Sequence, residues 1–481
     1  MKISKVCIRP AKCSLDIGDG SERSAYVNQD YMLRRLGRPH RGISLMYCYY
    51  PLDKEWPQRI SEAWKDRDVK FAWDYPYDDY FPYGGGIDGN TEGEPFVFMK
   101  DVRKHGQDVI LTITCDPHIS DEHIIAIAKD LRPYGRMMLR INHEATGTWF
   151  SFNKRAGYQE VADFFVRFHR IIKEYAPNVS TVLCIGSLAA DGSGKVEKEE
   201  EFTEAIRTAD IWSVDEYVSL NWGWPYEIAT KDTTQHRRRG VREVYQLVKD
   251  TYHRFTEING GVAKPMVMSE FNTDADVVGV LEQAEDVREF YQYIREDEEN
   301  WLSGITFYQF RDDGRLGLEM TDFNNSGVGI EQPVMKAYKE ILGDKYFYPD
   351  IRTGENTELP AVLRWGSSED AEGIAVDIEL DGNPHYAEAY FEGTLAGANL
   401  IMEINGQWFY KAPGVKYIDF MPAFFDNSIS GKKTVKLNIF APPAEGVNDE
   451  EQGDDWIMNY YYTMTELPKM RFEFEPVVHR P

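Results

Sequence analysis

The apolar residues of this 481-residue chain gather in short runs that recur between residues 42 and 311. In these runs apolar, β-branched and aromatic residues follow one another, without the alternation of a strand that is exposed on one face. Continuous apolar character is typical of strands that are covered on both faces. Eight segments show this pattern: 43–50, 69–75, 108–115, 136–144, 179–187, 211–218, 265–271 and 304–310.

Amphipathic helical patterns fill most of the gaps between these runs. The segment "YQEVADFFVRFHRIIKEYAPN" repeats apolar residues at i, i+3, i+4 and i+7, namely Val161, Phe164, Phe165, Phe168, Ile171 and Ile172. "VREVYQLVKDTYHRF" and "LEQAEDVREFYQYIRE" behave similarly, and "PVMKAYKEILG" closes the eighth unit. Eight strands alternating with helices predict a (β/α)₈ TIM barrel over residues 41–347. A doubly wound open sheet is the rival, but that fold rarely needs eight such units.

The pattern changes near Tyr348. From residue 360 onward short alternating strands replace the helices, and an Asn-Gly turn stands at 405–406. We therefore predict a C-terminal β-sandwich over residues 348–481, a candidate carbohydrate-binding module. Residues 1–40 do not classify clearly, and they either cross the barrel bottom or add to the sandwich.

The charge balance restricts the class of partner. Asp and Glu outnumber Lys and Arg by 80 to 54, which disfavours nucleic acid and anionic membranes as partners. The five cysteines form neither a disulfide framework nor a C-x-x-C zinc site. No apolar run reaches the roughly 18 residues of a membrane span, and the N-terminus lacks the apolar core of a signal peptide. We expect a cytoplasmic location, or secretion if a leader is missing from the sequence.

The stretch "RMMLRINHEATGTWF" ends a predicted strand at a His-Glu pair. His-Glu begins the zinc-protease motif H-E-x-x-H, but Gly147 stands where the second histidine would have to be. The other histidines show no ligand-like spacing. We therefore expect no metal and no other cofactor.

A second glutamate gives Glu144 a different meaning. In a (β/α)₈ barrel the active site lies at the C-terminal ends of the strands. Glu144 ends the fourth predicted strand and Glu270 ends the seventh, and these strands face each other across the ring. Two carboxylates about 5–5.5 Å apart are the apparatus of a retaining glycosidase. One protonates the leaving oxygen and later activates water, while the other attacks the anomeric carbon.

Three segments of the chain resemble clan A glycoside hydrolases. "RINHEATGTWF" is similar to the fourth-strand signature of glycoside hydrolase family 26, R-P-[LF]-H-E-x-x-G-x-W-[FW]. "ADIWSVDEYV" resembles that family's sixth strand, although Glu216 replaces a glycine, and "KPMVMSEFNT" resembles the seventh. The tail "SEFNT" also resembles family 39. The resemblance implies Glu144 as acid/base, Glu270 as nucleophile and Tyr217 as the hydrogen-bond partner of the nucleophile, with Arg140 and His143 in support. Two departures are Asn142, in place of an apolar residue, and the missing tryptophan after Phe150.

Strand alternation supports part of this scheme. Arg140 lies four residues before Glu144, so both side chains are expected on the inner face. A buried cation favours an ionised carboxylate, so we expect Arg140 to serve the nucleophile. His143 points the other way by the same rule unless the strand end bulges, and a binding or supporting role is open to it.

Several residues near the strand ends are candidates for binding a sugar. Aromatic rings stack on the apolar face of a sugar ring, and amide or imidazole groups bond its hydroxyls. The candidates are Trp149, Trp222, Trp224, His118, Gln309 and Asn272. In the terminal module Trp408, Tyr410 and Trp456 could form a carbohydrate-binding face, or pack in the sandwich core or at its seam with the barrel.

These observations predict a retaining β-glycoside hydrolase whose partner is a β-linked oligo- or polysaccharide. The resemblance to family 26 makes β-1,4-mannan or manno-oligosaccharides the first choice, with β-1,3-xylan and mixed-linkage β-glucan as alternatives. A family 39-like β-glycosidase and a non-catalytic glycan-binding barrel are the rivals. The sequence leaves the sugar, endo or exo action and the oligomeric state open.

Overall fold

The computed structural model describes residues 2–21, 26–58, 81–221, 236–312, 314–325, 327–366, 371–425, 429–444 and 459–474. Eight parallel strands close into a ring, because β2 pairs with both β12 and β3. In ring order the strands are β2 (Ser14–Gly18), β3 (Gly42–Tyr49), β5 (Asp108–Cys115), β6 (Met137–Ile141), β7 (Val179–Cys184), β8 (Ile211–Asp215), β11 (Met266–Phe271) and β12 (Leu302–Phe307). The predicted (β/α)₈ barrel is therefore confirmed.

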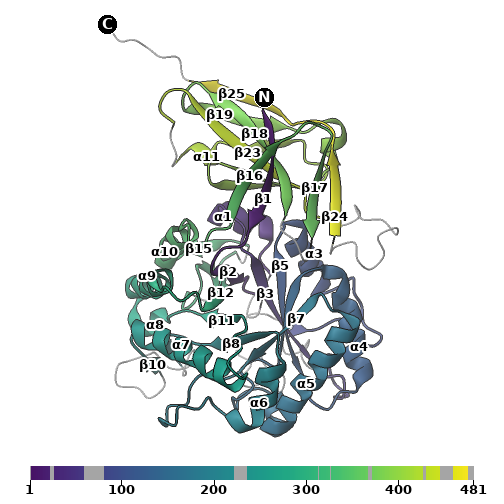
Figure 1. The fold of residues 1–481 in the computed structure, drawn as a ribbon, viewed down its shortest axis with the longest axis vertical. Coiled ribbons are helices and arrows are strands. Elements are labelled where there is room, and N and C mark those ends of the chain that lie inside the picture. The colour runs from purple at the N-terminus through teal and green to yellow at the C-terminus, as the bar shows by residue number, and fades with distance from the viewer. Residues whose placement is uncertain are drawn as a thin grey trace.

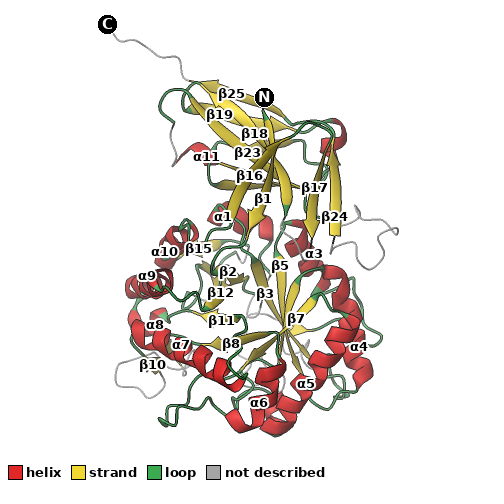
Figure 2. Ribbon diagram, in the orientation of Figure 1, coloured by secondary structure: helices red, strands yellow, loops and turns green. Residues whose placement is uncertain are grey.

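An outer layer of helices covers this ring (Figures 1 and 2). The helices are α1 (Gln29–Leu36), α3 (Phe96–Lys104), α4 (Asp121–Leu131), α5 (Tyr158–Tyr175), α6 (Glu199–Thr208), α7 (Val241–Ile258), α9 (Val280–Glu296) and α10 (Pro333–Leu342). α5 buries the apolar stripe that its sequence predicts, including Val161, Phe164, Phe168 and Ile172. β3 and β5 are buried at every position, as expected for strands covered on both faces.

The first barrel strand lies outside the predicted barrel range. β2 falls within residues 1–40, so segment 43–50 is the second strand, and the predicted strand 69–75 lies outside the described residues. Asp16, a charged residue at the centre of β2, interrupts the apolar sequence that would predict a buried strand. Its side chain is buried against Arg41, whose Nε donates to Asp16 Oδ1 at 2.9 Å. β6 and β11 remain the fourth and seventh strands of the ring.

The C-terminal residues form two antiparallel sheets with a shared apolar core. The larger sheet contains β16 (Asp350–Asn356), β17 (Ala361–Gly366), β18 (Glu372–Leu380), β20 (Leu400–Ile404), β21 (Gln407–Lys411), β23 (Lys433–Phe440) and β24 (Asn459–Met464). The smaller contains β19 (Pro384–Tyr390), β22 (Tyr417–Asp419) and β25 (Lys469–Phe474). The N-terminal strand β1 (Ile3–Arg9) lies between β16 and β18, so this part of residues 1–40 adds to the sandwich.

The sandwich packs against the end of the barrel where the strands begin (Figure 1). The Trp408 backbone N–H donates to Gly37 O at 2.8 Å, at the end of α1. The Tyr410 ring lies on His105, just after α3, with ring centroids 3.8 Å apart. Trp408 is 4 % exposed, so it and Tyr410 belong to the seam rather than to a free sugar-binding face. Trp456, the third candidate there, lies outside the described residues.

Shorter strands lie at the other end of the barrel, where the barrel strands end. β9 (Ser219–Asn221) pairs with β10 (His236–Arg238), and β13 (Arg311–Asp312), β14 (Glu319–Thr321) and β15 (Gly329–Glu331) form a small sheet before α10. In the described part of the chain, no helix has the length and apolar character to cross a lipid bilayer.

Candidate active site

The C-terminal ends of the barrel strands bring Glu144, Asp215 and Glu270 into one region. Glu144 follows β6, Asp215 is the last residue of β8 and Glu270 lies near the end of β11. This is the end of a (β/α)₈ barrel at which active sites are built. The sandwich lies at the other end and leaves this face to the loops.

Both oxygens of Glu270 accept hydrogen bonds. Nη2 of Arg140 donates to Oε1 at 2.9 Å, and the hydroxyl of Tyr217 donates to Oε2 at 2.8 Å. Glu270 is 7 % exposed, so water contributes little to its solvation. Charge-assisted hydrogen bonds of this kind hold a carboxylate in one orientation and favour its ionised form.

Arg140 also bonds a second carboxylate. Its Nη1 lies 2.9 Å from Asp215 Oδ2, and its Nε donates to Thr112 Oγ1 at 2.7 Å. Ser269 donates to Asp215 Oδ1 at 2.6 Å and thereby fixes that carboxylate. Arg140 is 1 % exposed, so its rigid fork is locked between Asp215 and Glu270. No role for Asp215 or Ser269 followed from the sequence, although Asp215 stands in the strand-six motif.

The two glutamates differ in their electrostatic surroundings. Burial and the neighbouring carboxylates of Asp215 and Glu270 raise the pKa of Glu144 well above its ordinary value. Burial and Asp215 also raise the pKa of Glu270, to about 7, against the opposing effects of Arg140 and Tyr217. Because Arg140 bonds Glu270 and not Glu144, we take Glu270 to ionise first. Glu144 is then the group that keeps its proton at neutral pH.

A tight turn carries Glu144 out of its strand. Asn142 and Glu144 both have left-handed backbone conformations, each with φ of 49°. The Asn142 side chain accepts from Cys115 N at 2.6 Å and donates to Cys115 O at 3.2 Å, which ties the turn to the end of β5. Asparagine tolerates left-handed φ better than most residues, which accounts for Asn142 where the resemblance gives an apolar residue.

Trp149 closes over the carboxyl group of Glu144. Its Nε1–H donates to Glu144 Oε2 at 2.7 Å, yet the side chain remains 43 % exposed. A Cβ on Gly147 would lie only 2.6 Å from Cζ2 of the indole, so Gly147 makes room for it. An exposed ring beside the acid is compatible with the predicted sugar platform.

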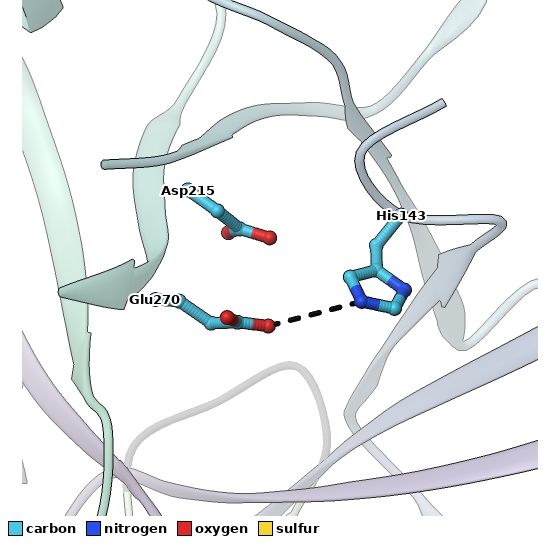
Figure 3. Close-up of side chains that lie close together, drawn as sticks. All are labelled: His143, Asp215 and Glu270. Carbon is cyan, nitrogen blue, oxygen red and sulfur yellow. Dashed lines mark ion pairs between the residues drawn. The ribbon is translucent and has the colours of Figure 1, made fainter. Parts of the chain in front are cut away.

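His143 lies on the same side as Arg140. Its Nε2 is 3.9 Å from Glu270 Oε1, and Figure 3 shows His143, Asp215 and Glu270 converging from three strand ends. Strand alternation alone would point His143 away from Arg140. The left-handed backbone of Asn142 interrupts that alternation and turns His143 to the inner face. Burial and the nearby Arg140 lower the pKa of His143 well below its ordinary value, so the imidazole is neutral.

These three residues also have the spacing of a metal site. One ligand atom from each of His143, Asp215 and Glu270 lies within 4.8 Å of the others. Both carboxylates already bond Arg140, however, whose guanidinium supplies the compensating positive charge. A divalent cation would have to share this space with a buried arginine, so the residues present do not fit a metal.

The remaining predicted residues differ in their access to a substrate. His118 follows β5 with a side chain that is 52 % exposed and bonds Asp116 at 3.0 Å. Gln309 is 2 % exposed and packs against Gly18.

Asn272 is fully buried and its amide donates to the backbone oxygens of Tyr308 and Leu316. Asn272 thus holds the loop together, and its contacts do not fit the predicted substrate binding. Trp222 and Trp224 lie outside the described residues.

Glu216, where the resemblance has a glycine, does not join the carboxylate cluster. It accepts from Ser187 Oγ at 2.6 Å and pairs with Arg239. The negative charge of Glu216 is therefore compensated by Arg239, and its side chain is not a partner of Glu270.

No protein-family model matches the chain, and no curated protein matches it by sequence. Similar solved structures include a family 39 glycoside hydrolase from the gut symbiont Bacteroides cellulosilyticus WH2, at 13 % identity over 90 % of this chain and 81 % of that chain, with a TM-score of 0.42. A modular endo-β-1,4-mannanase of family 26 from Cellulomonas fimi is 10 % identical over 90 % and 93 %, with a TM-score of 0.43. The family 51 arabinofuranosidase from Xanthomonas axonopodis pv. citri is 14 % identical over 92 % and 98 %, also with a TM-score of 0.43. At such low identities and scores, any assignment of a reaction has to come from the chain's own residues.

Proposed function

We propose that this protein is a retaining β-glycoside hydrolase in which Glu270 is the nucleophile and Glu144 the general acid/base. The observation that carries the proposal is the contrast between two carboxyl groups at one barrel mouth. Glu270 is fixed at both oxygens by Arg140 and Tyr217. Among the described residues Glu144 has no such cationic partner, and it accepts a hydrogen bond from the indole of Trp149. One carboxylate poised for attack and one protonated acid are the two groups that double displacement needs.

In the first step Glu144 gives its proton to the glycosidic oxygen as the bond from that oxygen to the anomeric carbon breaks. Glu270 attacks the same carbon and forms a glycosyl ester. Glu270 loses its negative charge when the ester forms. The positive charge of Arg140 is still compensated after this step, because Arg140 also bonds the Asp215 carboxylate. In the second step Glu144, now ionised, takes a proton from water as the water oxygen attacks the anomeric carbon. The bond from that carbon to Glu270 breaks, and Glu270 leaves with its charge restored.

We propose a β-1,4-linked mannan or manno-oligosaccharide as the substrate. The support is the likeness of "RINHEATGTWF" and "VDEY" to family 26 motifs, together with the exposed Trp149 ring beside the acid. The mechanism requires no metal and no other cofactor.

The experiment is a product profile over β-mannans, β-glucans and β-xylans, with proton NMR of the first product formed. We expect manno-oligosaccharides to be cleaved and the β-anomer to appear before mutarotation. First appearance of the α-anomer would contradict the retaining mechanism. A wild-type protein that binds a glycan but releases no reducing sugar from any β-glycan would contradict catalysis itself.

A further inference from the structure

A cavity of about 340 Å³ lies between the bottom of the barrel and the sandwich. Its barrel wall comes from the first residues of the strands, among them Ser14, Met137 and Ile211, and its sandwich wall includes Trp365 and Trp408. This is the opposite end of the barrel from Glu144 and Glu270. The volume falls near the lower end of the range for small-molecule sites, about 300–1,000 Å³. It is an order of magnitude more than the roughly 30 Å³ that one water occupies.

The polar lining of the cavity is cationic. Arg38, Arg41 and Arg136 line it, against a single carboxylate from Asp108. Burial lowers the pKa of His40, another lining residue, to about 3, so it adds no charge at neutral pH. The chain as a whole has a net charge of −26, so a cluster of arginines here runs against its overall balance.

Two of these arginines have carboxylate partners. Arg41 bonds Asp16, and Nε of Arg136 donates to Asp108 Oδ2 at 2.7 Å. The Arg136 side chain is 51 % exposed, so its end of the cavity wall lies at the molecular surface. Within the described ranges, Arg38 is then the lining arginine that has no carboxylate partner.

Arg38 is 6 % exposed, and no carboxylate pairs with it among the described residues. It donates to the backbone oxygen of Leu342, and its guanidinium lies 3.9 Å from the centre of the Tyr348 ring. Its Nε–H is buried and finds no hydrogen-bond partner in the part of the chain that the structure describes. A buried, unpaired cation is costly to maintain, and an anion in the adjoining cavity would relieve that cost.

Much of the remaining lining is apolar or aromatic, although Ser14, His40, His105 and Ser180 also contribute to it. Met137, Met138 and Ile401 line the cavity together with Trp365 and Trp408. Trp408 is held in place by a 2.8 Å hydrogen bond from its Nε1 to the Tyr348 hydroxyl, beside Arg38. Small-molecule sites combine largely apolar and aromatic walls with a few placed polar groups, and here Arg38 is the lining cation without a carboxylate partner among the described residues. This combination fits a ring that carries one anionic group.

We propose that this cavity binds a small ligand that combines a sugar-sized ring with one anionic group, either a sugar acid or a sugar phosphate. The anionic group pairs with Arg38, and the ring lies between the strand starts and the two tryptophans of the sandwich. Such a ligand contacts both domains and strengthens their docking. The inference goes beyond the proposed glycosidase and does not depend on it.

The test is isothermal titration of the full chain with glucuronate, glucose 6-phosphate, glucose and inorganic phosphate. We expect one saturable site for glucuronate or for glucose 6-phosphate, and which of them binds identifies the anionic group. Glucose and phosphate each lack half of the recognised chemistry, so we expect roughly tenfold weaker binding or none. Failure of both sugar anions to bind, or equal binding of glucose or phosphate, overturns the proposal.

Three variants locate the site, because a sugar could also bind at the proposed active site. Arg38→Met removes the charge, and Ser180→Phe fills the cavity from β7 without altering Arg38. Both are expected to abolish binding. Arg34→Met, on a side chain of α1 that is 66 % exposed, is the matched control and should bind as the wild type does. Binding that persists in folded Ser180→Phe and Arg38→Met proteins overturns the proposal, and Ser180→Phe alone decides if Arg38→Met does not fold.

Discussion

Arg140 and Glu270 stand 130 positions apart in the chain, and the structure joins them by a hydrogen bond of 2.9 Å from Nη2 to Oε1. The same guanidinium bonds Asp215 at 2.9 Å, so one buried cation serves two carboxylates. This arrangement gives Glu270, rather than Glu144, the hydrogen-bonded cation.

Replacing Arg140 by Met leaves Asp215 and Glu270 buried together without a cation. We expect kcat/KM to fall by roughly 10²–10³, because one charge-assisted contact to the nucleophile is lost and its pKa rises further. The free energy of unfolding should fall by about 3–5 kcal/mol, since a buried charge is left uncompensated. Arg295→Met, which removes a surface pair with Asp344, is the control and should change neither quantity appreciably. Unchanged kcat/KM in a folded Arg140→Met protein would contradict the assigned role.

Tyr217→Phe removes only the hydroxyl that donates to Glu270 Oε2. We expect kcat to fall by roughly 10–100-fold, because Glu270 loses the bond that orients Oε2. A hydrogen bond to a charged group contributes about 1.5–3 kcal/mol to stability, and the free energy of unfolding should fall by no more than that. Tyr293→Phe removes a similar bond to Glu289 on the surface of α9 and is the matched control. Steady-state kinetics of both variants check this, and equal effects would refute a special role for Tyr217.

Asp215→Asn changes the pH dependence of the reaction in a known direction. Glu270 must be ionised to attack, so its pKa of about 7 places the acid limb of kcat/KM near neutral pH. Removal of the Asp215 charge lowers that pKa, and Arg140 is then left to Glu270 alone. We expect the acid limb to move to lower pH by about one unit. Asp163→Asn, an exposed change on α5, should leave the profile in place, and a shift of the acid limb to higher pH in Asp215→Asn would be inconsistent with the pairing seen here.

Trp149 has two separable contributions. Trp149→Phe keeps an aromatic ring but loses the donor to Glu144, which favours the ionised acid. The pKa of Glu144 should therefore rise and the alkaline limb of kcat/KM should move to higher pH. Trp149→Ala also removes the ring, and we expect KM to increase by about tenfold relative to Trp149→Phe. Equal KM values in the two variants would show that the ring does not bind the sugar.

The chain's local patterns were sufficient to predict the barrel and the sandwich, and the roles of the two glutamates stay a prediction. Strands covered on both faces have continuous apolar sequences, and helix α5 repeats its apolar residues with helical spacing. The sequence pattern did not predict β2, because the charged Asp16 interrupts the apolar character of this five-residue strand. Its partner Arg41 lies 25 positions away in the chain. A charged residue inside a short strand can be recognised as buried only when the fold shows its partner, here Arg41 beside Asp16.

The site was harder to predict where long-range contacts decide it. The bond from Arg140 to Asp215 spans 75 positions, and nothing local to Asp215 marks it as a partner. His143 reaches Glu270 because of one left-handed residue, Asn142, and an asparagine at a strand end was the available signal. Trp408 is buried both by the sandwich core, where it stacks on Phe440, and by the contact of its strand with Gly37 of the barrel, so its burial could not be deduced from strand alternation alone.

The most direct test of the central claim is chemical rescue of Glu270→Gly with azide on activated aryl β-glycosides. The variant should lose nearly all activity, and azide should restore turnover and give an α-glycosyl azide, because it attacks from the face that Glu270 vacates. Glu144→Ala with azide should give the β-azide instead, since the ester to Glu270 still forms. Undiminished activity in Glu270→Gly, or rescue that yields the β-azide from it, would contradict the assignment of Glu270 as the nucleophile.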